Sequence, residues 1–362
     1  MKDINWAVLG TGVIANEMAV ALKKNGKNIY AVGNRTYEKA VAFGEKYGIG
    51  KVYADYNEMF TDPEVDVIYK IIFSFHMPAF IFVSGYFAKV EPKKILSRIF
   101  PLYIVFQLLR FLLDFILDSI MWGHPVKIDM QFFTPRWTLW YLMAMIIYQL
   151  LLPVFDTKNK RHRVAYLLLS MVLGIVIGYN PDTENFMAMS RIMNFLPFFL
   201  AGYYEKDGGF FLHYGKQRNP KEAKIATMFL AVGIIAGFIL VSRVSTRKLF
   251  WGTESFNGGV YTWYTRILAW IIAFLWIWIL IVWVPTKRIP VIETIGKNTL
   301  SIYLLHTIVI LILMYTPFKD WIFNKIGWQL AISVVLTLAL SWNGFERLLR
   351  KIAIPYYGNR KK

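Results

Sequence analysis

Residues 263–284 read WYTRILAWIIAFLWIWILIVWV, a run in which Arg266 is the charged side chain. An α-helix rises about 1.5 Å per residue and a bilayer core is about 30 Å thick, so a helix over this run would cross it. The whole chain shares the bias, since 56% of its 362 residues are hydrophobic and 18% are charged. We count about nine such runs, at residues 71–87, 99–122, 137–155, 164–179, 192–204, 225–242, 263–284, 299–316 and 328–342. They predict a multi-span α-helical membrane bundle of about nine transmembrane helices.

The net charge of +18 is concentrated in short segments between the apolar runs. Lysine and arginine clusters recur on one side of the predicted bundle, at residues 89–94, 158–163, 206–224, 287–297 and 347–362. Such loops face the cytoplasm, so we expect a multi-pass protein with a cytoplasmic C-terminus and contacts to membrane lipid. No basic face carries interleaved aromatic residues, so the charge does not predict a nucleic-acid partner. The chain has no cysteine, which excludes disulfides and thiolate chemistry, and no metal-ligand spacing stands out.

The first 69 residues follow a different pattern, which begins with a strand, a glycine-rich turn and a helix. Residues 4–10 read as a buried strand, and the turn GTGVIA follows at residues 10–15. Gly10 would permit the turn, Gly12 the close approach of a pyrophosphate, and Ala15 close packing of the helix. The pattern therefore indicates the start of a dinucleotide-binding fold.

Further elements follow this turn at the spacing of a βαβαβ unit. We expect a strand at 29–32, a helix at 37–47, a short strand near 52 and a last strand at 65–69. Asn34 and Arg35 follow the second strand. In an NAD-binding fold an acidic residue at this position would accept a hydrogen bond from a ribose hydroxyl. Arg35 favours a 2′-phosphate, so the implied cofactor is NADP.

Residues 5–69 also carry the motifs of a known family, namely NRT at 34–36, DY at 55–56 and DPEVDVIY at 62–69. They resemble the N-terminus of the glucose–fructose oxidoreductase and inositol dehydrogenase family. In that family the last strand continues into a lysine-bearing catalytic motif and a substrate domain, whereas here Lys70 begins an apolar run. The resemblance implies a partial α/β Rossmann-like segment, which either retains NADP binding or is a folded remnant that binds nothing productively.

Five motifs occur in order after residue 70. They are FHMP with VSGYF between 75 and 87, Arg98 with Pro101, WTLWYL at 137–142, FLPFFLAGY at 195–203 and IGKNTLSIYLLH at 295–306. Together they resemble the membrane acyltransferase-3 family, particularly its fucose 4-O-acetylase-like branch. The resemblance implies transfer of an acyl group, commonly from acetyl-CoA, to a sugar hydroxyl of an envelope polysaccharide or glycolipid. It also implies a place in the bacterial plasma membrane.

The family resembled has about ten spans, and its first span, which carries an arginine and a histidine, has no counterpart among the apolar runs. Nine spans with a cytoplasmic C-terminus would place the N-terminus outside, away from NADP, and one more span would correct this. We therefore expect a fusion of a truncated dinucleotide-binding segment at 1–69, an acyltransferase-like helical domain at 70–346 and a basic tail at 347–362. The alternatives are a non-catalytic remnant, a glycan or lipid transporter, and an NADP-dependent sugar oxidoreductase.

Two histidines are the candidate catalytic residues for acyl transfer. Transfer to a hydroxyl needs a base for the proton and donors for the developing oxyanion. His76 and His306 lie inside apolar runs, where a histidine is costly to bury and is functional by default. The alternative for each is an interhelical hydrogen bond. Pro78 would loosen the first of these helices and free backbone carbonyls to line a cavity.

Other polar and aromatic residues are candidates for binding substrate or acyl donor. Arg98 suits the phosphates of coenzyme A, with snorkelling to lipid headgroups as the alternative. Ser84, Asn298 and Ser301 could supply hydroxyl or amide donors, although Ser84 begins a Ser-Gly pair typical of helix contacts. Trp140 could stack a sugar or lie in the interfacial belt, as could Trp137 three residues earlier.

Arg110 lies within an apolar run, where a cation needs an anionic partner. Asp114 follows one helical turn later. The spacing predicts a structural ion pair between them.

Overall fold

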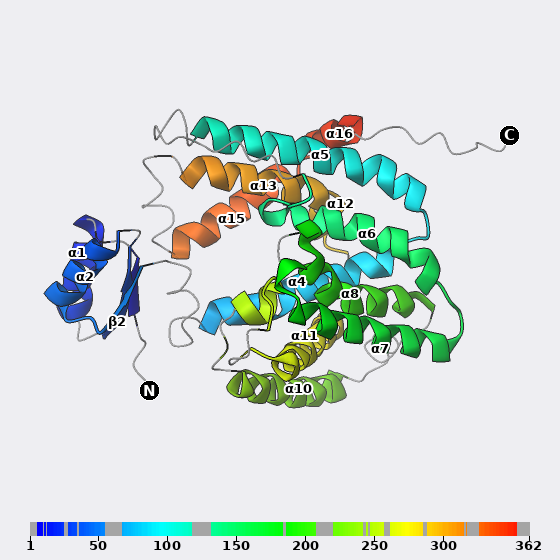
Figure 1. The fold of residues 1–362 in the computed structure, drawn as a ribbon, viewed down its shortest axis with the longest axis horizontal. Coiled ribbons are helices and arrows are strands. Elements are labelled where there is room, and N and C mark those ends of the chain that lie inside the picture. Colours follow the sequence, from blue (N-terminus) through cyan, green and yellow to red (C-terminus); the bar gives the residue numbers. More distant parts are fainter. Residues whose placement is uncertain are drawn as a thin grey trace. The chain divides into compact units, whose positions relative to one another are not determined.

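The computed structural model describes residues 6–9, 11, 13–24, 28–34, 36–54, 67–117, 132–183, 186–207, 220–241, 244, 247–256, 261–284, 288–314, 316 and 326–352. The chain divides into two compact units. Unit 1 contains residues 1–79, 220–252 and 257–279, and unit 2 contains residues 80–219, 253–256 and 280–362. Figure 1 shows the elements in chain order.

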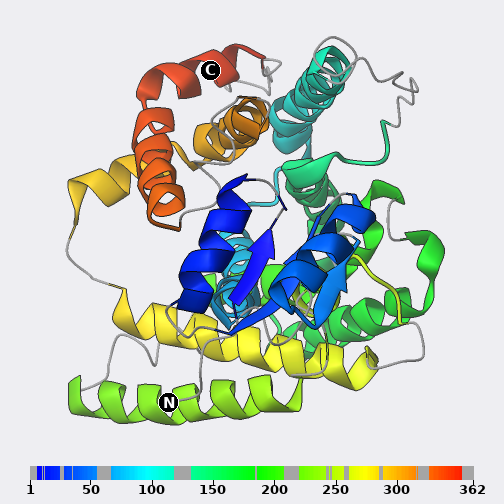
Figure 2. The same cartoon turned by 90° about the vertical axis from the view of Figure 1, so that its left-hand side faces the viewer.

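The N-terminal part of unit 1 is a small parallel α/β segment. Its strands β1 (Trp6–Leu9), β2 (Ile29–Gly33) and β3 (Lys51–Tyr53) pair in the order β1-β2-β3. The helices α1 (Val13–Lys24) and α2 (Tyr37–Tyr47) connect them, and Figure 2 shows these elements in blue. Parallel pairing requires such crossovers. Gly48 ends α2 with a φ of 61°, a conformation that glycine adopts at little cost.

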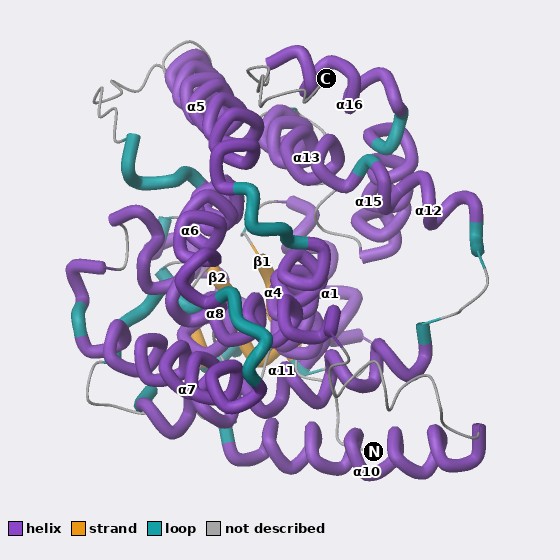
Figure 3. The backbone as a smooth tube through the Cα atoms, turned by 90° about the vertical axis from the view of Figure 1, so that its right-hand side faces the viewer, coloured by secondary structure: helices purple, strands orange, loops and turns teal. Residues whose placement is uncertain are grey.

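This segment has a hydrophobic core of its own. Val8, Ala19, Ile29, Val32 and Phe43 are all buried in it. The strands (orange in Figure 3) and both helices confirm the elements predicted up to Val52. The sequence therefore predicts the fold correctly where alternating apolar residues can form a two-layer core.

The predicted strand at 65–69 is wrong over the residues that the structure describes. Residues 65 and 66 lie outside them, and Val67 begins the helix α4 (Val67–Phe87). A long apolar helix satisfies its backbone hydrogen bonds within itself, whereas a strand needs a neighbour. Because an apolar run follows Lys70, residues 67–69 form the first turn of this helix instead of a strand.

Unit 1 also contains the helix α10 (Pro220–Leu240) and most of α11, which spans Trp263–Trp283. A π-helix, η7 (Arg247–Trp251), lies between them in the chain. A Cβ added at Gly237 would lie 2.7 Å from Ile272, and one at Gly233 would lie 3.2 Å from Leu275. These two contacts run in opposite directions along the helices, so α10 and α11 pack as an antiparallel pair through small residues.

Unit 2 is a bundle of helices. Its elements are α5 (Pro92–Ile116), a 3₁₀ turn η2 (Trp137–Leu139), α6 (Trp140–Phe155), α7 (Lys160–Val176), α8 (Met189–Tyr204), α12 (Pro290–Lys297), α13 (Thr299–Met314), α15 (Ile326–Leu340) and α16 (Asn343–Ile352). Shorter 3₁₀ turns are η3 (Ile177–Tyr179), η4 (Pro181–Thr183), η5 (Phe186–Ala188) and η6 (Glu205–Asp207). The helix pairs α7 with α8, α5 with α6, and α13 with α15 pack together, as Figure 1 shows.

The C-terminal end of α4, which belongs to unit 2, crosses α8 at very close range. A Cβ added at Gly85 would overlap the carbonyl oxygen of Phe199, and one at Gly202 would overlap that of Phe82. Each glycine therefore lets the backbone of the other helix approach. The contact fixes Ser84, the neighbour of Gly85, on this part of the bundle.

Four helices among the described residues are long and apolar enough to cross a membrane, namely 92–116, 137–155, 160–179 and 263–283. Helices α12 and α13 qualify as one further span, bent by 74°. Residues 73–87, 225–238 and 331–340 form shorter apolar helices, and α8 forms at the position of the predicted fifth span. The helical membrane class is confirmed, whereas the count of nine spans stays a prediction.

Candidate functional site

A chain of polar side chains connects α4, α6 and α13 within unit 2. The hydroxyls of Ser84 and Tyr141 lie 2.8 Å apart, and Ser84 also donates to the carbonyl of Phe80, at 2.7 Å. Since the single Ser84 proton goes to that carbonyl, Tyr141 is the donor to Ser84. The ring of Tyr303 lies 5.1 Å from that of Tyr141. Three helices therefore bring hydroxyl groups together that are far apart in the sequence.

His306 lies one helical turn from Tyr303 on α13, with the two rings 6.1 Å apart. Its Nδ1 lies 2.8 Å from the carbonyl oxygen of Ile302. A carbonyl can only accept, so Nδ1 carries a proton and neutral His306 keeps its lone pair on Nε2. This tautomer is the one that a general base uses.

Aromatic packing and a short turn hold this cluster in place. The hydroxyl of Tyr303 donates to the carbonyl of Thr138, in the turn before α6. The ring of Phe80 contacts those of Tyr141, at 4.8 Å, and Tyr303, at 6.2 Å. We call Ser84, Tyr141, Tyr303 and His306 the hydroxyl–histidine cluster.

Trp140 precedes Tyr141 in α6 and is buried. Its ring stacks on Phe195 at 5.5 Å, and the guanidinium of Arg191 lies 5.2 Å from its centre. Stacking of a sugar on Trp140 stays a prediction, whereas Trp137, three residues earlier, is 50% exposed. Arg191 adds a positive charge near the start of α6.

Asn298 and Ser301 stabilise the bend between α12 and α13. The Asn298 amide donates to the carbonyl of Ser341, at 2.7 Å, and to the side chain of Asn343, at 2.8 Å. Ser301 bonds to the carbonyls of Asn298 and Leu340, each at 2.8 Å. Both are buried, so the structure shows a structural role for them, and their role as substrate donors stays a prediction.

His76 belongs to unit 1, whereas His306 belongs to unit 2. The ring centroids of His76 and Phe73 lie 4.6 Å apart, and the ring of Phe73 stacks on that of Trp251 with their centroids 5.8 Å apart. Pro78 follows inside the same helix, as the sequence predicted. The side chain of His76 is thus set in an aromatic environment and is partly buried.

Arg98 is exposed on α5, two turns after the helix begins. Close to it in sequence, Glu91 accepts a hydrogen bond from Lys94 at 2.7 Å, and this contact lowers the pKa of Glu91. The exposure suits either lipid headgroups or a soluble donor. Both predicted roles of Arg98 stay open.

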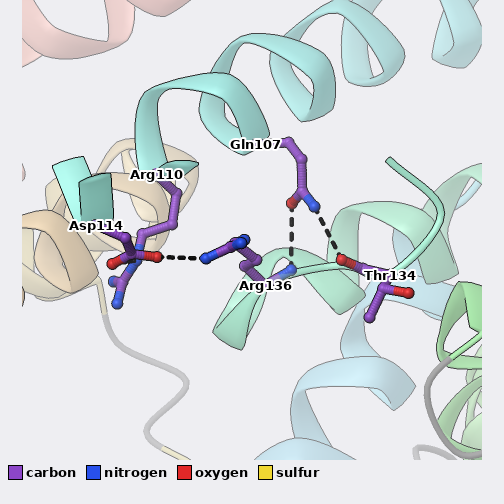
Figure 4. A network of polar contacts seen from close by, with 5 residues as sticks. All are labelled: Gln107, Arg110, Asp114, Thr134 and Arg136. Carbon is purple, nitrogen blue, oxygen red and sulfur yellow. Dashed lines mark hydrogen bonds and ion pairs between the residues drawn. The ribbon is translucent and has the colours of Figure 1, made fainter. Parts of the chain in front are cut away.

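Arg110 and Asp114 form the predicted ion pair, with Nε and Oδ1 3.0 Å apart. Sequence reasoning missed Arg136, whose Nη1 lies 2.7 Å from the other carboxylate oxygen (Figure 4). Gln107 accepts from the backbone N–H of Arg136 and donates to the carbonyl of Thr134. The segment before α6 is therefore tied to α5 by a polar network.

The N-terminal segment shows part of its predicted dinucleotide site. Asn34 donates from its amide to the hydroxyl of Thr11, at 3.2 Å, which connects the end of β2 to the turn after β1. Ala15 is buried against the sheet, as close helix packing requires. Gly10, Gly12 and Arg35 lie outside the described residues.

Tyr141, Tyr303 and Arg191 are site residues that the sequence did not single out. Tyr141 and Tyr303 lie inside motifs used for the family resemblance, and a hydroxyl inside an apolar run was the signal available for both. Among the residues that the structure describes, no group of three histidine, aspartate or glutamate side chains could hold a metal ion.

Two family profiles match the chain. Residues 47–344 match a family described as an acyltransferase domain. Residues 4–75 match a family described as an oxidoreductase family with an NAD-binding Rossmann fold. The two matches overlap at 47–75, where the α/β segment gives way to α4.

Curated relatives match the N-terminal segment. A trans-1,2-dihydrobenzene-1,2-diol dehydrogenase of Xenopus laevis is 39% identical over 67 residues, which is 18% of this chain and 20% of the relative. An uncharacterized oxidoreductase of Rhizobium meliloti is 31% identical over 71 residues, which is 19% of this chain and 21% of the relative. The chain thus spans about a fifth of the length of these relatives. No solved structure matches the chain.

Proposed function

Because the chain belongs to the membrane acyltransferase family that matches residues 47–344, we propose that it transfers an acetyl-type group to a sugar hydroxyl of an envelope polysaccharide or glycolipid. Acetyl-CoA or a similar thioester would be the donor. The observation that carries the proposal is the hydroxyl–histidine cluster, in which Nε2 of His306 keeps its lone pair.

The cluster has the groups that this reaction needs. Nε2 of His306 accepts the proton of the sugar hydroxyl, whose oxygen attacks the thioester carbonyl carbon. A C–O bond forms, the C–S bond breaks, and His306 returns the proton to the sulfur of the leaving thiolate. The reaction is therefore balanced without an oxidant or a metal ion.

The developing oxyanion needs a hydrogen-bond donor, and Tyr141 is the candidate. Its O–H donates a hydrogen bond to the hydroxyl oxygen of Ser84, which is a neutral acceptor. A hydrogen bond to an anion is roughly twice as strong as one between neutral groups, so turning this O–H to the oxyanion is favourable in the transition state. Such differential binding accelerates the chemical step.

The acyl donor and the membrane side complete the proposal. Exposed Arg98 would contact the phosphates of coenzyme A, whereas the catalytic role of His76, which lies in unit 1, stays a prediction. The basic end of α16 supports a cytoplasmic C-terminus, and the plasma membrane of a bacterium is the proposed location. Lipid and a glycan acceptor are then the partners.

The test is acetyl incorporation into envelope glycan by cells that carry the protein or a variant. His306→Ala should lower incorporation by about a hundredfold or more, because general-base catalysis contributes about 10²–10⁴. Thr294→Ala, which changes an exposed hydroxyl on α12, is the control and should have no effect. Incorporation that survives His306→Ala would refute the catalytic role, whereas no incorporation by the unchanged protein would favour a remnant or a transporter.

The match of residues 4–75 supports a second proposal, which is residual NADP binding by the N-terminal segment. Asn34 and Thr11 lie at the end of β2 and after β1, where a ribose and a pyrophosphate would be held. Calorimetric titration of NADP into the whole purified chain tests this. If NADP gives a heat of binding with the unchanged chain and none with the Asn34→Ala variant, the site is supported. If NADP gives no heat of binding with the unchanged chain, the segment is a folded remnant.

A further inference from the structure

A cluster of two arginines and one aspartate lies where α5 approaches the segment before α6. Asp114 contacts Arg110 at 3.0 Å and Arg136 at 2.7 Å, as Figure 4 shows in part. Two guanidinium groups and one carboxylate leave one positive charge without a counter-charge within the cluster. The cluster is therefore suited to an anion.

Arg110 carries an unused donor in this cluster. Its side chain is 9% exposed, and its Nη1 is buried without a hydrogen-bond partner among the described residues. Leaving a buried charged donor unsatisfied is costly, and such groups in proteins call for an explanation. An oxygen of a bound anion would satisfy it, and Arg136, which is 35% exposed, lies open to the same anion.

The cluster is held rigidly before any ligand arrives. Tyr103, Gln107, Arg110 and Asp114 share one face of α5, at the spacing of successive helical turns. Tyr103 donates to the carbonyl of Phe132, at 2.5 Å, and Gln107 donates to a carbonyl two residues later in the same segment. Rigid donors lower the entropic cost of binding.

Trp137 adds an aromatic surface to the charge. The guanidinium of Arg110 lies 4.3 Å from the centre of its ring, and the residue is 50% exposed. Its φ is 49°, a left-handed conformation that non-glycine residues rarely adopt and that is enriched at ligand sites. The backbone carbonyl of the next residue, Thr138, accepts a hydrogen bond from the hydroxyl of Tyr303, which belongs to the hydroxyl–histidine cluster. A sugar on Trp137 would thus lie next to that cluster.

We propose that Arg110, Arg136 and Trp137 bind a phosphate group attached to the acyl acceptor. The binding site stands on the geometry, and only its connection to the acceptor rests on the proposed function. Phosphate fits because two guanidinium forks present several N–H groups to its oxygens. Arg110 is about 27 Å along the helix axis from Pro92, so it lies near the membrane surface opposite Lys93 and Lys94. A phosphorylated sugar or a lipid phosphate would meet it there.

The first experiment measures binding without catalysis. Inorganic phosphate is titrated calorimetrically into the full chain, purified in a neutral detergent. Arg136→Gln should weaken binding by about tenfold or more, since a charge-assisted contact is lost. Arg161→Gln, which changes an exposed arginine on α7, is the matched control and should bind as the unchanged chain does. Equal binding by the Arg136→Gln variant would overturn the proposal.

A second variant tests the charge balance and guards against loss of folding. Asp114→Asn removes the competing carboxylate, so phosphate should bind more tightly and should raise the Tm of this variant more than that of the unchanged chain. A purely structural cluster predicts the opposite, namely a lower Tm that phosphate does not restore. That outcome would overturn the proposal.

The two sources of phosphate are distinguished by two probes. Glucose 1-phosphate is titrated as the soluble probe, and native mass spectrometry measures phosphatidylglycerol that stays bound through purification. If the Arg136→Gln variant loses binding of glucose 1-phosphate, the phosphate belongs to a soluble sugar. If it loses the bound phosphatidylglycerol, the phosphate belongs to a lipid. If both probes bind to the variant as they do to the unchanged chain, the site is refuted. His306→Ala should keep phosphate binding, so a failure of the acyl-transfer proposal leaves this result readable by itself.

Discussion

The crossing of α4 and α8 gives the sharpest prediction of stability. Gly202→Ala places a methyl group where the carbonyl oxygen of Phe82 already lies. The clash involves backbone, so no side-chain rotation can relieve it and the two helices must separate. Overpacking of this kind costs about 1–3 kcal/mol or more, and we expect the upper part of that range.

Gly296→Ala is the matched control for this variant. Gly296 lies in α12, and a Cβ added there would have no heavy atom within 4 Å. Alanine inside a helix is favoured over glycine by about 0.5–1 kcal/mol, so this variant should keep or raise the Tm. Both are compared by thermal unfolding in the same detergent, followed by circular dichroism. A Gly202→Ala variant that is as stable as the unchanged chain would show that the helices do not cross through these glycines.

Four further predictions concern function, packing, pH dependence and topology. Tyr141→Phe should lower kcat of acyl transfer by about 10²–10³ with little change in KM, because its hydroxyl acts on the transition state, and steady-state kinetics would check this. Asn298→Ala should destabilise the chain by about 1–3 kcal/mol, since it leaves the buried carbonyl of Ser341, between α15 and α16, without its donor, and a thermal unfolding temperature equal to that of the unchanged chain would contradict this. Partial desolvation of its amine lowers the pKa of Lys206 below its usual 10.5, so the folded chain releases this proton at a lower pH than the unfolded chain does. Stability should therefore rise as the pH passes from the folded pKa towards 10.5, and a plot of Tm against pH should lack this rise in the Lys206→Gln variant. The chain has no cysteine, so Arg350→Cys should react with an impermeant maleimide in inverted vesicles and not in intact cells, if the C-terminus is cytoplasmic.

The sequence predicted most elements of the N-terminal segment because each follows from local chemistry. Alternating apolar residues and the glycine-rich turn placed β2 and α2 within a residue of their observed bounds. The strand expected at 65–69 failed because it was placed by the spacing of a βαβαβ unit, while the apolar run beyond Lys70 favours a helix that begins at Val67. The local preference of residues 67–69 for a helix therefore prevails over the strand that a βαβαβ order would require.

The candidate site was predicted only in part. The sequence identified His306 and Ser84 as polar residues inside apolar runs, and both belong to the hydroxyl–histidine cluster. The contacts among Ser84, Tyr141 and Tyr303 depend on how α4, α6 and α13 pack, and side-chain periodicity does not determine which helices meet. Arg136 was missed for the same reason, because it reaches Asp114 from a segment that follows α5 in the chain.

Helix α7 presents mainly small residues to the protein, with Ser170 and Gly174 buried and Val172 and Val176 exposed. Its outward surface therefore makes no specific packing contact with the other residues that the structure describes. A small lipophilic label attached at position 172 should leave the rest of the bundle undisturbed. This makes α7 a practical position for a probe of the surrounding lipid.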